Sequence, residues 1–310
     1  MCDAQGVDVD LSDFFPQMAE YALVYYSLKR HYRSFLIKIN PKILFVVCHY
    51  ARQRMIFTEL AKEMGIPVIE LQHGTCGVEH PAYNYYQIEE VKQFPDYFFA
   101  FSKFWTEQAR FPIPPNHRIA VGNPYGEIRT AELKRVITRA EPAMILFLSQ
   151  PGRGETLSVI AANLYEMIDR DCYQIIYKMH PSEHLGWQER YHRMRDAGVP
   201  VADNTNSDLY TLIARASFVV ASGNTTALYE ALQFGAPCFI HLEQSMEEFK
   251  KMYESGIVGG FHTATDLYQL IRDPKAVDQN NDFWEKNSLL KMKDAIAQIA
   301  ATRSKNEDVN

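Results

Sequence analysis

The sequence predicts an α/β protein with two parallel sheets whose faces are covered by helices. Short apolar runs alternate with amphipathic segments along nearly all of the 310 residues, and this β-α-β alternation is typical of parallel sheets. Hydrophobic residues make up 47% of the chain, enough for a sizeable core, and 23% are charged, which is ordinary for a globular protein. The pair Glu141-Pro142 interrupts the pattern near the middle of the chain. We therefore predict domains at 1–140 and 141–280, followed by a closing helical segment at 281–310.

Composition excludes several classes of function. The formal net charge of −6 argues against nucleic-acid binding, which needs a basic face. The five cysteines are scattered without CxxC or Cys/His zinc spacing, so we expect reduced thiols and a cytoplasmic setting. No apolar run reaches the roughly 18 residues that a membrane helix needs. The first residues are acidic and polar, unlike a signal peptide.

The first half contains four predicted strands, preceded by a helical stretch. Residues 14–39 are rich in aromatic and basic side chains and predict one or two helices. This mixture could make a peripheral membrane contact or touch a lipid-linked acceptor, although a solvated helix face over an apolar underside explains it better. The predicted strands are 42–48, 67–71, 96–101 and 118–121, and the helices between and after them are 51–64, 103–110 and 127–139.

The second half repeats the alternation with more strands. Its predicted strands are 144–149, 174–179, 199–202, 217–221, 237–241 and 257–260. Its predicted helices are 156–169, 184–197, 208–214, 225–234, 245–255 and 264–271, with a closing helix at 282–302. The polar tail after residue 302 predicts disorder.

One junction in this half predicts a phosphate site. The strand SFVVAS ends at Ser222, a small polar loop follows, and the helical pattern ALYEALQFG begins at once. Free N–H groups at a helix start attract anions, and Thr225 and Thr226 add hydroxyl groups. Glu230 lies one turn further on, where its carboxylate could accept hydrogen bonds from a ribose diol. Ordinary helix capping by Asn224 or Thr225 is the alternative, and spacing alone does not decide between the two.

Three further loops follow predicted strands, where ligands sit in open parallel sheets. The motif QHGT begins at Gln72, and its His73 could act as a general base or as a hydrogen-bond donor. A lone histidine is more often structural, but the adjacent glycine and the nearby His80 favour function. The loop SQPGRGE contains two glycines and Arg153, which makes it a second candidate for phosphate contact. In YKMHP, the proline after His180 ends the strand.

Seven motifs, taken in order, resemble a known family. They are LQHGT, EHPAY, FPDYFFAFSKFW, VGNPY, LFLSQP, YKMHPSE and SGNTTALYEALQFGAP. This series, within residues 42–237, is similar to the bacterial surface and capsular polysaccharide glycosyltransferases of GT-B fold. The HP motif with a Ser/Thr-rich loop resembles the group with cytidylate-activated donors, which includes sialyl-, polysialyl- and Kdo transferases and the glycerophosphotransferases of teichoic acid synthesis. The resemblance implies two Rossmann-like domains whose parallel sheets face a cleft.

The resemblance also implies roles for individual residues. His180 would contact the donor phosphate or nucleotide, and Glu230 the ribose hydroxyls. His73 would face the reaction centre from the other domain, although Glu79 or His80 on the same loop could replace it as the base. The predicted catalytic residues are His73 and His180, and the predicted substrate- and nucleotide-binding residues are Gln72, Gly74, Thr75, Arg153, Lys178, Pro181, Glu183, Ser222, Gly223, Asn224, Thr225, Thr226 and Glu230. We expect neither a metal nor a cofactor besides the donor substrate, because no DxD motif follows a strand.

The sequence departs from this family at its start. Only three or four strands are visible in residues 1–140, so the N-terminal, acceptor-side domain looks abbreviated. It could be a minimal domain, part of a longer chain, or a domain that a partner subunit or oligomer completes.

We therefore expect a metal-independent cell-envelope glycosyltransferase. A CMP- or CDP-linked donor is favoured and a UDP-linked donor is the alternative, with a surface glycan or lipid-linked acceptor at the inner face of the membrane. A nucleotide-sugar 2-epimerase shares this fold but needs several carboxylates near the sugar, and no clear set is visible. A nucleotide-binding subunit without activity is a third hypothesis.

Overall fold

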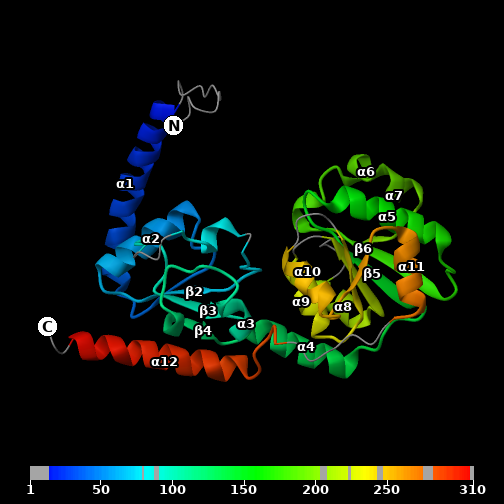
Figure 1. The fold of residues 1–310 in the computed structure, drawn as a ribbon. Helices are drawn as coiled ribbons and strands as arrows, with labels where there is room; N and C mark the ends of the chain where they lie inside the picture. The colour runs from blue at the N-terminus through cyan, green and yellow to red at the C-terminus, as the bar shows by residue number, and fades with distance from the viewer. Residues whose placement is uncertain are drawn as a thin grey trace.

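The chain forms two parallel sheets with helices on their faces, which confirms the predicted α/β class (Figure 1). The computed structural model describes residues 14–78, 80–86, 91–202, 208–222, 225–242, 247–274 and 282–307. The smaller sheet comes from the first half of the chain and the larger sheet from the second half.

The smaller sheet has the strand order β1-β2-β3-β4, and every pairing is parallel. Its strands are β1 (Leu44–Val46), β2 (Val68–Leu71), β3 (Tyr97–Ala100) and β4 (Arg118–Ala120). Its helices are α1 (Phe14–Ile39), α2 (Arg52–Glu63) and α3 (Lys103–Thr106), with 3-10 turns at Pro81–Tyr83 and Pro115–His117. The segment predicted as one or two helices is the single helix α1, which packs on α2.

The larger sheet has the strand order β10-β9-β8-β5-β6-β7, again entirely parallel. Its strands are β5 (Ala143–Leu148), β6 (Tyr173–Lys178), β7 (Val201–Ala202), β8 (Phe218–Ser222), β9 (Cys238–His241) and β10 (Gly259–Phe261). Its helices are α5 (Gly154–Met167), α6 (Trp187–Arg190), α7 (His192–Asp196), α8 (Leu209–Arg215), α9 (Thr226–Leu232), α10 (Glu247–Glu254) and α11 (Ala264–Arg272), with a 3-10 turn at Pro181–Glu183. The strand order reverses between β5 and β8, and ligands of such sheets bind beyond the carboxyl ends of strands at this point.

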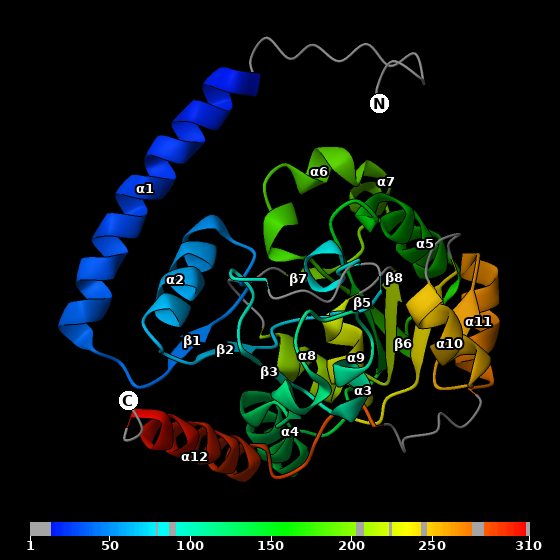
Figure 2. The ribbon, with the colours of Figure 1, turned by 60° about the vertical axis from the view of Figure 1, so that its left-hand side comes forward.

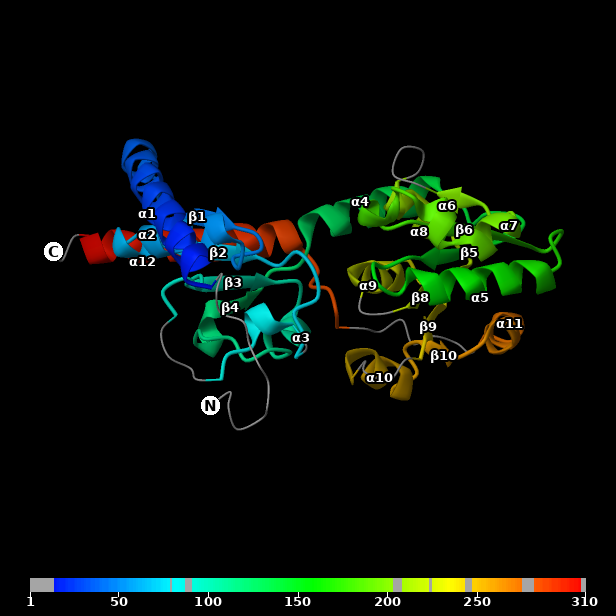
Figure 3. The same cartoon turned by 90° about the horizontal axis from the view of Figure 1, so that it is seen from above.

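Two helices connect the sheets. Helix α4 (Pro124–Val136) follows β4 and lies below both halves of the molecule in Figure 1, and α12 (Ser288–Glu307) runs back along the smaller sheet. Ala295 and Ile299 of α12 pack with Ile69, Phe99 and Val121 of that sheet. Figure 3 shows the two halves side by side with α4 passing between them.

The segment 282–287, just before α12, holds the two sheets together. Trp105 of the smaller half donates its indole N–H to the carbonyl of Phe283 at 3.0 Å, and Trp284 donates to the carbonyl of Tyr229 in α9 at 3.0 Å. The Phe283 ring lies 5.0 Å from the Tyr229 ring, centroid to centroid. We call residues 282–287 the aromatic strap. Because it contacts both halves, it fixes how their loops meet.

The strap also explains a difference from the predicted closing helix. That helix was expected from residue 282, but α12 begins at Ser288, because Phe283 and Trp284 are held by hydrogen bonds to the two halves. Asn287, just before the helix, has a positive φ of 58°. Glu127 of α4 accepts hydrogen bonds from the backbone N–H groups of Asn287 at 2.9 Å and Ser288 at 2.8 Å, and so caps the first turn of α12. At its other end α12 continues to Glu307, where the sequence predicted a disordered tail.

Other element boundaries shift by a few residues. Helix α4 begins at Pro124, three residues before the predicted start, because the Asn123 side chain accepts the Gly126 N–H and acts as the N-cap. The predicted helix 184–197 is two short helices, α6 and α7, preceded by Gly186 at a φ of 67°. Glycine adopts a positive φ without strain, and Gly186 separates the 3-10 turn from α6.

Replacing Glu127 with alanine will destabilise the protein by about 1 kcal/mol at neutral pH, the usual cost of losing a helix cap. Burial raises the pKa of Glu127, but the hydrogen bonds from Ser288 and Asn287 outweigh it and leave the pKa below 4.5. A lowered folded pKa means that this stabilisation is present above about pH 4.5 and is lost as the pH falls through the folded value. Urea unfolding at pH 7 and pH 3.5 measures the effect.

The matched control is Glu132→Ala on the same helix, where the carboxylate is exposed and pairs with Arg129. Its loss is expected to change stability by less than about 0.5 kcal/mol. Equal effects of the two substitutions would contradict the capping role of Glu127.

Candidate functional site

The QHGT loop of the smaller sheet meets the start of α9 from the larger sheet. A Cβ atom added to Gly74 would lie 3.3 Å from the hydroxyl oxygen of Thr226. These residues are about 150 positions apart in the chain, and the sequence predicted a binding role for each. The structure therefore brings two predicted motifs, one from each sheet, to the same place.

The turn from β8 into α9 lies at the switch point of the larger sheet. Ser222 ends β8 and is fully buried, and Thr226 begins α9, which has only seven residues. Thr225 is the N-cap residue, but its side chain makes no capping hydrogen bond, so the capping alternative does not account for this threonine. Gly223 and Asn224 lie outside the described residues.

Glu230 lies further along α9, largely buried, where it accepts a hydrogen bond from the Tyr210 hydroxyl of α8. Burial raises its pKa to about 7, and the hydrogen bond from Tyr210 only partly opposes this. Burial also raises the pKa of Tyr210. Without a ligand, the Glu230 carboxyl group is therefore close to half protonated at neutral pH.

The HPSE motif forms a closed hydrogen-bond network at the end of β6. The Ser182 N–H donates to His180 Nδ1 at 3.2 Å, while the buried Glu183 carboxylate accepts from the His180 N–H at 3.3 Å and from the Tyr191 hydroxyl. Because Nδ1 is an acceptor, the neutral His180 ring carries its proton on Nε2. The His180 side chain is exposed, so this Nε2–H group is available as a donor.

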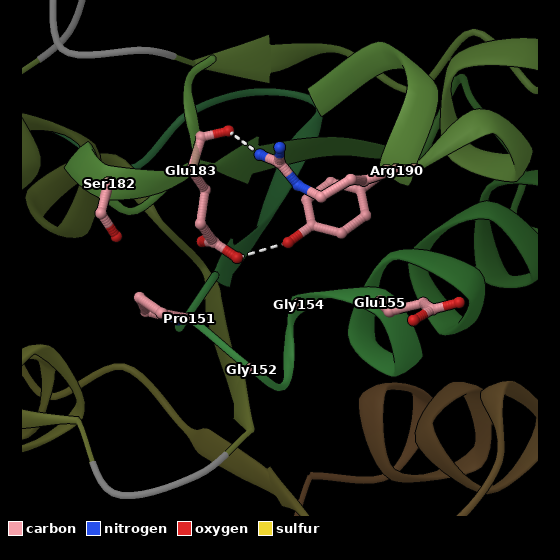
Figure 4. Close-up of a pocket in the computed structure, with 8 residues that line it drawn as sticks. Pro151, Gly152, Gly154, Glu155, Ser182, Glu183 and Arg190 are labelled. Carbon is pink, nitrogen blue, oxygen red and sulfur yellow. Dashed lines mark hydrogen bonds between the residues drawn. The ribbon is translucent and has the colours of Figure 1, made fainter. Parts of the chain in front are cut away.

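The loop after β5 packs tightly onto this network. A Cβ at Gly154 would lie only 2.4 Å from the Glu183 carboxylate and 2.2 Å from the Tyr191 hydroxyl oxygen, so this position requires glycine. Between this loop and the HPSE turn lies a pocket of about 480 Å³ (Figure 4). It is lined by Pro151, Gly152, Gly154, Glu155, Ser182, Glu183, Arg190 and Tyr191.

His73 lies at the end of β2 with an exposed side chain. Its Nε2 is 3.1 Å from the Cys48 sulfur and 3.3 Å from the Tyr50 hydroxyl oxygen. Desolvation by the surrounding atoms lowers its pKa, and the negative charge of Glu70 opposes this effect without reversing it. The ring is consequently neutral at pH 7 and able to accept a proton. Desolvation also lowers the pKa of His80. Glu79 lies outside the described residues.

The sequence analysis missed a buried histidine–carboxylate pair beside His73. Glu70 in β2 is fully buried and accepts hydrogen bonds from His49 Nδ1 at 2.6 Å and from the Tyr83 hydroxyl at 2.9 Å. Among the buried side-chain atoms of the described residues, His49 Nε2 has no hydrogen-bond partner. A glutamate inside the apolar run PVIEL is the signal that could have found this pair, because a buried charge needs partners.

Five further predicted binding residues follow the strand ends, and they differ in their contacts and exposure. Gln72 is occupied structurally, because its amide donates to the Gly74 carbonyl at 2.8 Å and accepts from the Phe101 N–H at 2.7 Å. Lys178 is buried at the end of β6, with its ammonium group 3.4 Å from the Met179 carbonyl oxygen. The other three are Thr75, half-buried in the QHGT loop, Arg153, half-buried before α5, and Pro181, exposed in the HPSE turn.

In the described ranges, no three or more His, Cys, Asp or Glu side chains are grouped so that they could hold a metal ion. Within the same residues, no helix has both the length and the apolar character needed to cross a bilayer.

Comparison with known proteins identifies the family. The family model described as "LIC12162 family transferase" matches residues 11–256, most of the chain. The chain belongs to the LIC12162 family of transferases. It is therefore an enzyme that transfers a chemical group. No curated protein matches the chain.

Solved structures show which fold this transferase has. The UDP-GlcNAc 2-epimerase of Neisseria meningitidis, solved with UDP-GlcNAc bound, superposes with a TM-score of 0.63 at 13% identity, over 89% of this chain and 81% of that one. The S. aureus MnaA–UDP structure superposes with a TM-score of 0.59 at 14% identity, over 89% of this chain and 80% of that one. The glycotransferase of kitacinnamycin superposes with a TM-score of 0.52 at 11% identity, over 97% of this chain and 84% of that one. At these identities the likeness establishes the fold alone, the two-sheet fold shared by GT-B glycosyltransferases and 2-epimerases.

The buried Glu230 carboxylate is expected to destabilise the ligand-free transferase above neutral pH. A folded pKa of about 7 exceeds the unfolded value, so the native state binds more protons between about pH 4.5 and 7, and stability rises as the pH falls through that window. Glu230→Gln keeps a hydrogen-bond acceptor but no charge. At pH 8 it is expected to be more stable than wild type by at most about 3 kcal/mol, and this difference should vanish near pH 4.5.

Thermal or urea unfolding across pH 4.5–8 measures this difference. Glu189→Gln, at an exposed position on α6, serves as the control and should leave the pH dependence unchanged. A constant difference between Glu230→Gln and wild type across the range would show that Glu230 does not titrate near 7.

Proposed function

We propose that this transferase moves a sugar from a nucleotide-activated donor to a hydroxyl group of a surface glycan or lipid-linked acceptor, in the cytoplasm. The observation that carries the proposal is the approach of Gly74 to Thr226. This approach brings the QHGT loop of the smaller sheet, which contains His73, against the turn from β8 into α9 of the larger sheet. A transferase needs such an arrangement, because a base and a leaving-group site must act on one substrate pair.

The donor would bind on the larger sheet. Thr225, Thr226 and the His180 Nε2–H group supply neutral donors for phosphate oxygens, and they would stabilise the negative charge that develops as the phosphate departs. Glu230 would accept hydrogen bonds from the ribose hydroxyls in place of the one from Tyr210. The HP motif favours a CMP- or CDP-linked donor. A UDP-linked donor is the alternative, because relatives of this fold were solved with UDP-GlcNAc and with UDP.

The acceptor would be activated by His73 from the smaller sheet. Its neutral ring can take the proton of the attacking hydroxyl group, which would enter where the Tyr50 hydroxyl now lies, 3.3 Å from Nε2. Loss of the donor phosphate leaves positive charge on the anomeric carbon. The buried Glu70 carboxylate beside His73 would favour the protonated ring that forms after proton transfer.

A nucleotide-sugar 2-epimerase is the second candidate. The N. meningitidis 2-epimerase superposes with a higher TM-score, 0.63, than the glycotransferase of kitacinnamycin, with 0.52. Membership of a transferase family favours transfer. Incubation with UDP-GlcNAc and no acceptor separates the candidates, because an epimerase forms the 2-epimer and a glycosyltransferase leaves the sugar unchanged.

Replacing His73 with alanine is expected to lower kcat about 100-fold or more, the usual contribution of a general base. Nucleotide affinity should stay within two-fold of wild type, because His73 lies on the other sheet. Because desolvation lowers the pKa of His73, the loss of wild-type activity that protonation of this ring causes is expected below pH 6.5, and it should be absent from the pH profile of the variant. Steady-state kinetics with radiolabelled donors measure this effect. His192→Ala, at an exposed position on α7, is the control, and equal turnover in both variants would remove His73 from the mechanism.

Replacing Thr226 with valine is expected to weaken nucleotide binding roughly ten-fold or more, because a hydrogen bond to a charged group contributes about 1.5–3 kcal/mol. Isothermal titration with CMP, CDP, UDP and GDP measures the loss and also ranks the bases. Thr302→Val on α12 is the control, since its exposed hydroxyl donates to the Gln298 carbonyl of the same helix. Unchanged affinity in Thr226→Val would contradict the phosphate site, and a preference for UDP would exclude a cytidylate donor.

A further inference from the structure

Helix α1 uses only part of its surface to hold the smaller half together. Tyr25, Leu28, Tyr32 and Leu36 pack in the core cluster with α2, and Lys29 pairs with Glu59 at 2.7 Å and with Glu63 at 2.8 Å. Residues 15–23 are all exposed. Figure 2 shows the first turns of α1 reaching beyond α2 and clear of both sheets. An apolar helix start of this length gains little stability alone in water.

One exposed face of α1 forms a straight line along the helix, which we call the outer stripe. It consists of Phe15, Ala19, Ala22, Tyr26, Arg30, Arg33 and Ile37, and every member is exposed. The steps of four and three residues repeat every 11 positions, close to the period of an α-helix, so the stripe moves around the helix by only about 20° per repeat. Phe15, Tyr26 and Ile37, one repeat apart, expose 72%, 70% and 63% of their surface.

The outer stripe is symmetric about Tyr26. Its other members lie 4, 7 and 11 positions away on both sides of this residue. If two α1 helices pack antiparallel with Tyr26 at the crossing, Phe15 meets Ile37 of the second copy. The small residues Ala19 and Ala22 then lie opposite the long arginines of the other helix. This pairing of small with large side chains lets two helices pack closely.

Charge selects the antiparallel orientation. The described first half of α1 has one charged residue, Glu20, whereas the second half contains the cations Lys29, Arg30, Arg33 and Lys38. Lys29 and Arg33 form ion pairs with carboxylates of α2, so Arg30 contributes most of the positive charge of the stripe. Parallel pairing would place these cations against their own copies. Antiparallel pairing separates them, and it also brings the positive helix start beside the negative end of its neighbour. An anionic lipid surface suits the stripe less well, because its first half has no cation and Asp8, Asp10 and Asp13 precede it in the sequence.

We propose that a second copy of this chain binds along the outer stripe, with the two α1 helices antiparallel and a two-fold axis through Tyr26. Such an interface is isologous, since each copy presents the same surface. Each 26-residue helix is about 39 Å long, so the contact extends over the whole element. The proposal does not depend on the chemistry of the cleft.

Sedimentation velocity from 1 to 100 µM tests the association. Wild type is expected to sediment as a dimer, and Ala22→Arg as a monomer, because the new arginine would face Arg30 of the second copy. A 100-fold weaker association or more is expected. Ser27→Arg adds the same charge to the same helix away from the stripe and should remain dimeric. A monomeric wild type, or equal association of the two variants, would overturn the proposal.

Disulfide cross-linking tests the orientation, with exposed Cys172 and the terminal Cys2 replaced by serine. Tyr26→Cys is expected to cross-link to its own copy, and Phe15→Cys only when mixed with Ile37→Cys. Self-linking of Phe15→Cys alone would indicate parallel packing and refute the proposal. Flotation with vesicles of phosphatidylglycerol and phosphatidylcholine is the remaining measurement. A monomer that floats with these vesicles, and no longer does so as Ala22→Arg, would assign the stripe to lipid instead.

Discussion

The contact of the aromatic strap with both halves is the constraint on which the rest of the structure depends. Phe283 and Trp284 bond to Trp105 on one side and to Tyr229 on the other, and the core cluster around them includes residues of both sheets. Tyr229 belongs to α9, the helix that contains Thr226 and Glu230. The strap therefore holds the predicted phosphate turn itself, and the distance between Gly74 and Thr226 follows from this contact.

The electrostatics of the site follow from burial. Desolvation is the leading effect on the pKa of His73 in the QHGT loop and of Glu230 in α9, in opposite directions. Both shifts favour the neutral form near pH 7. A neutral imidazole can accept the proton of a hydroxyl group, and a partly neutral carboxyl group repels an anionic donor less than a fully charged carboxylate would.

Much of this arrangement was predictable from the sequence, and the limits have physical causes. Apolar runs such as 174–179 revealed buried strands, and the residues after them marked the strand ends where ligands bind. The strand order was not predictable, because it depends on pairing between distant segments. Glu70 escaped notice because periodicity classes a glutamate in an apolar run as solvent-facing, and only the fold shows that His49 and Tyr83 surround it. The late start of α12 escaped notice for a similar reason, since its cap Glu127 lies 161 positions away.

Tyrosine hydroxyl groups accompany the two buried carboxylates of the larger sheet. Tyr191 donates to Glu183, and Tyr210 donates to Glu230. A phenol satisfies a carboxylate without neutralising it, unlike an arginine, which would form a lasting ion pair. In the proposed donor site, a ribose hydroxyl group would replace the Tyr210 hydroxyl as the hydrogen-bond donor to Glu230. Because this would exchange one neutral donor for another, ionic strength should have little influence on that step.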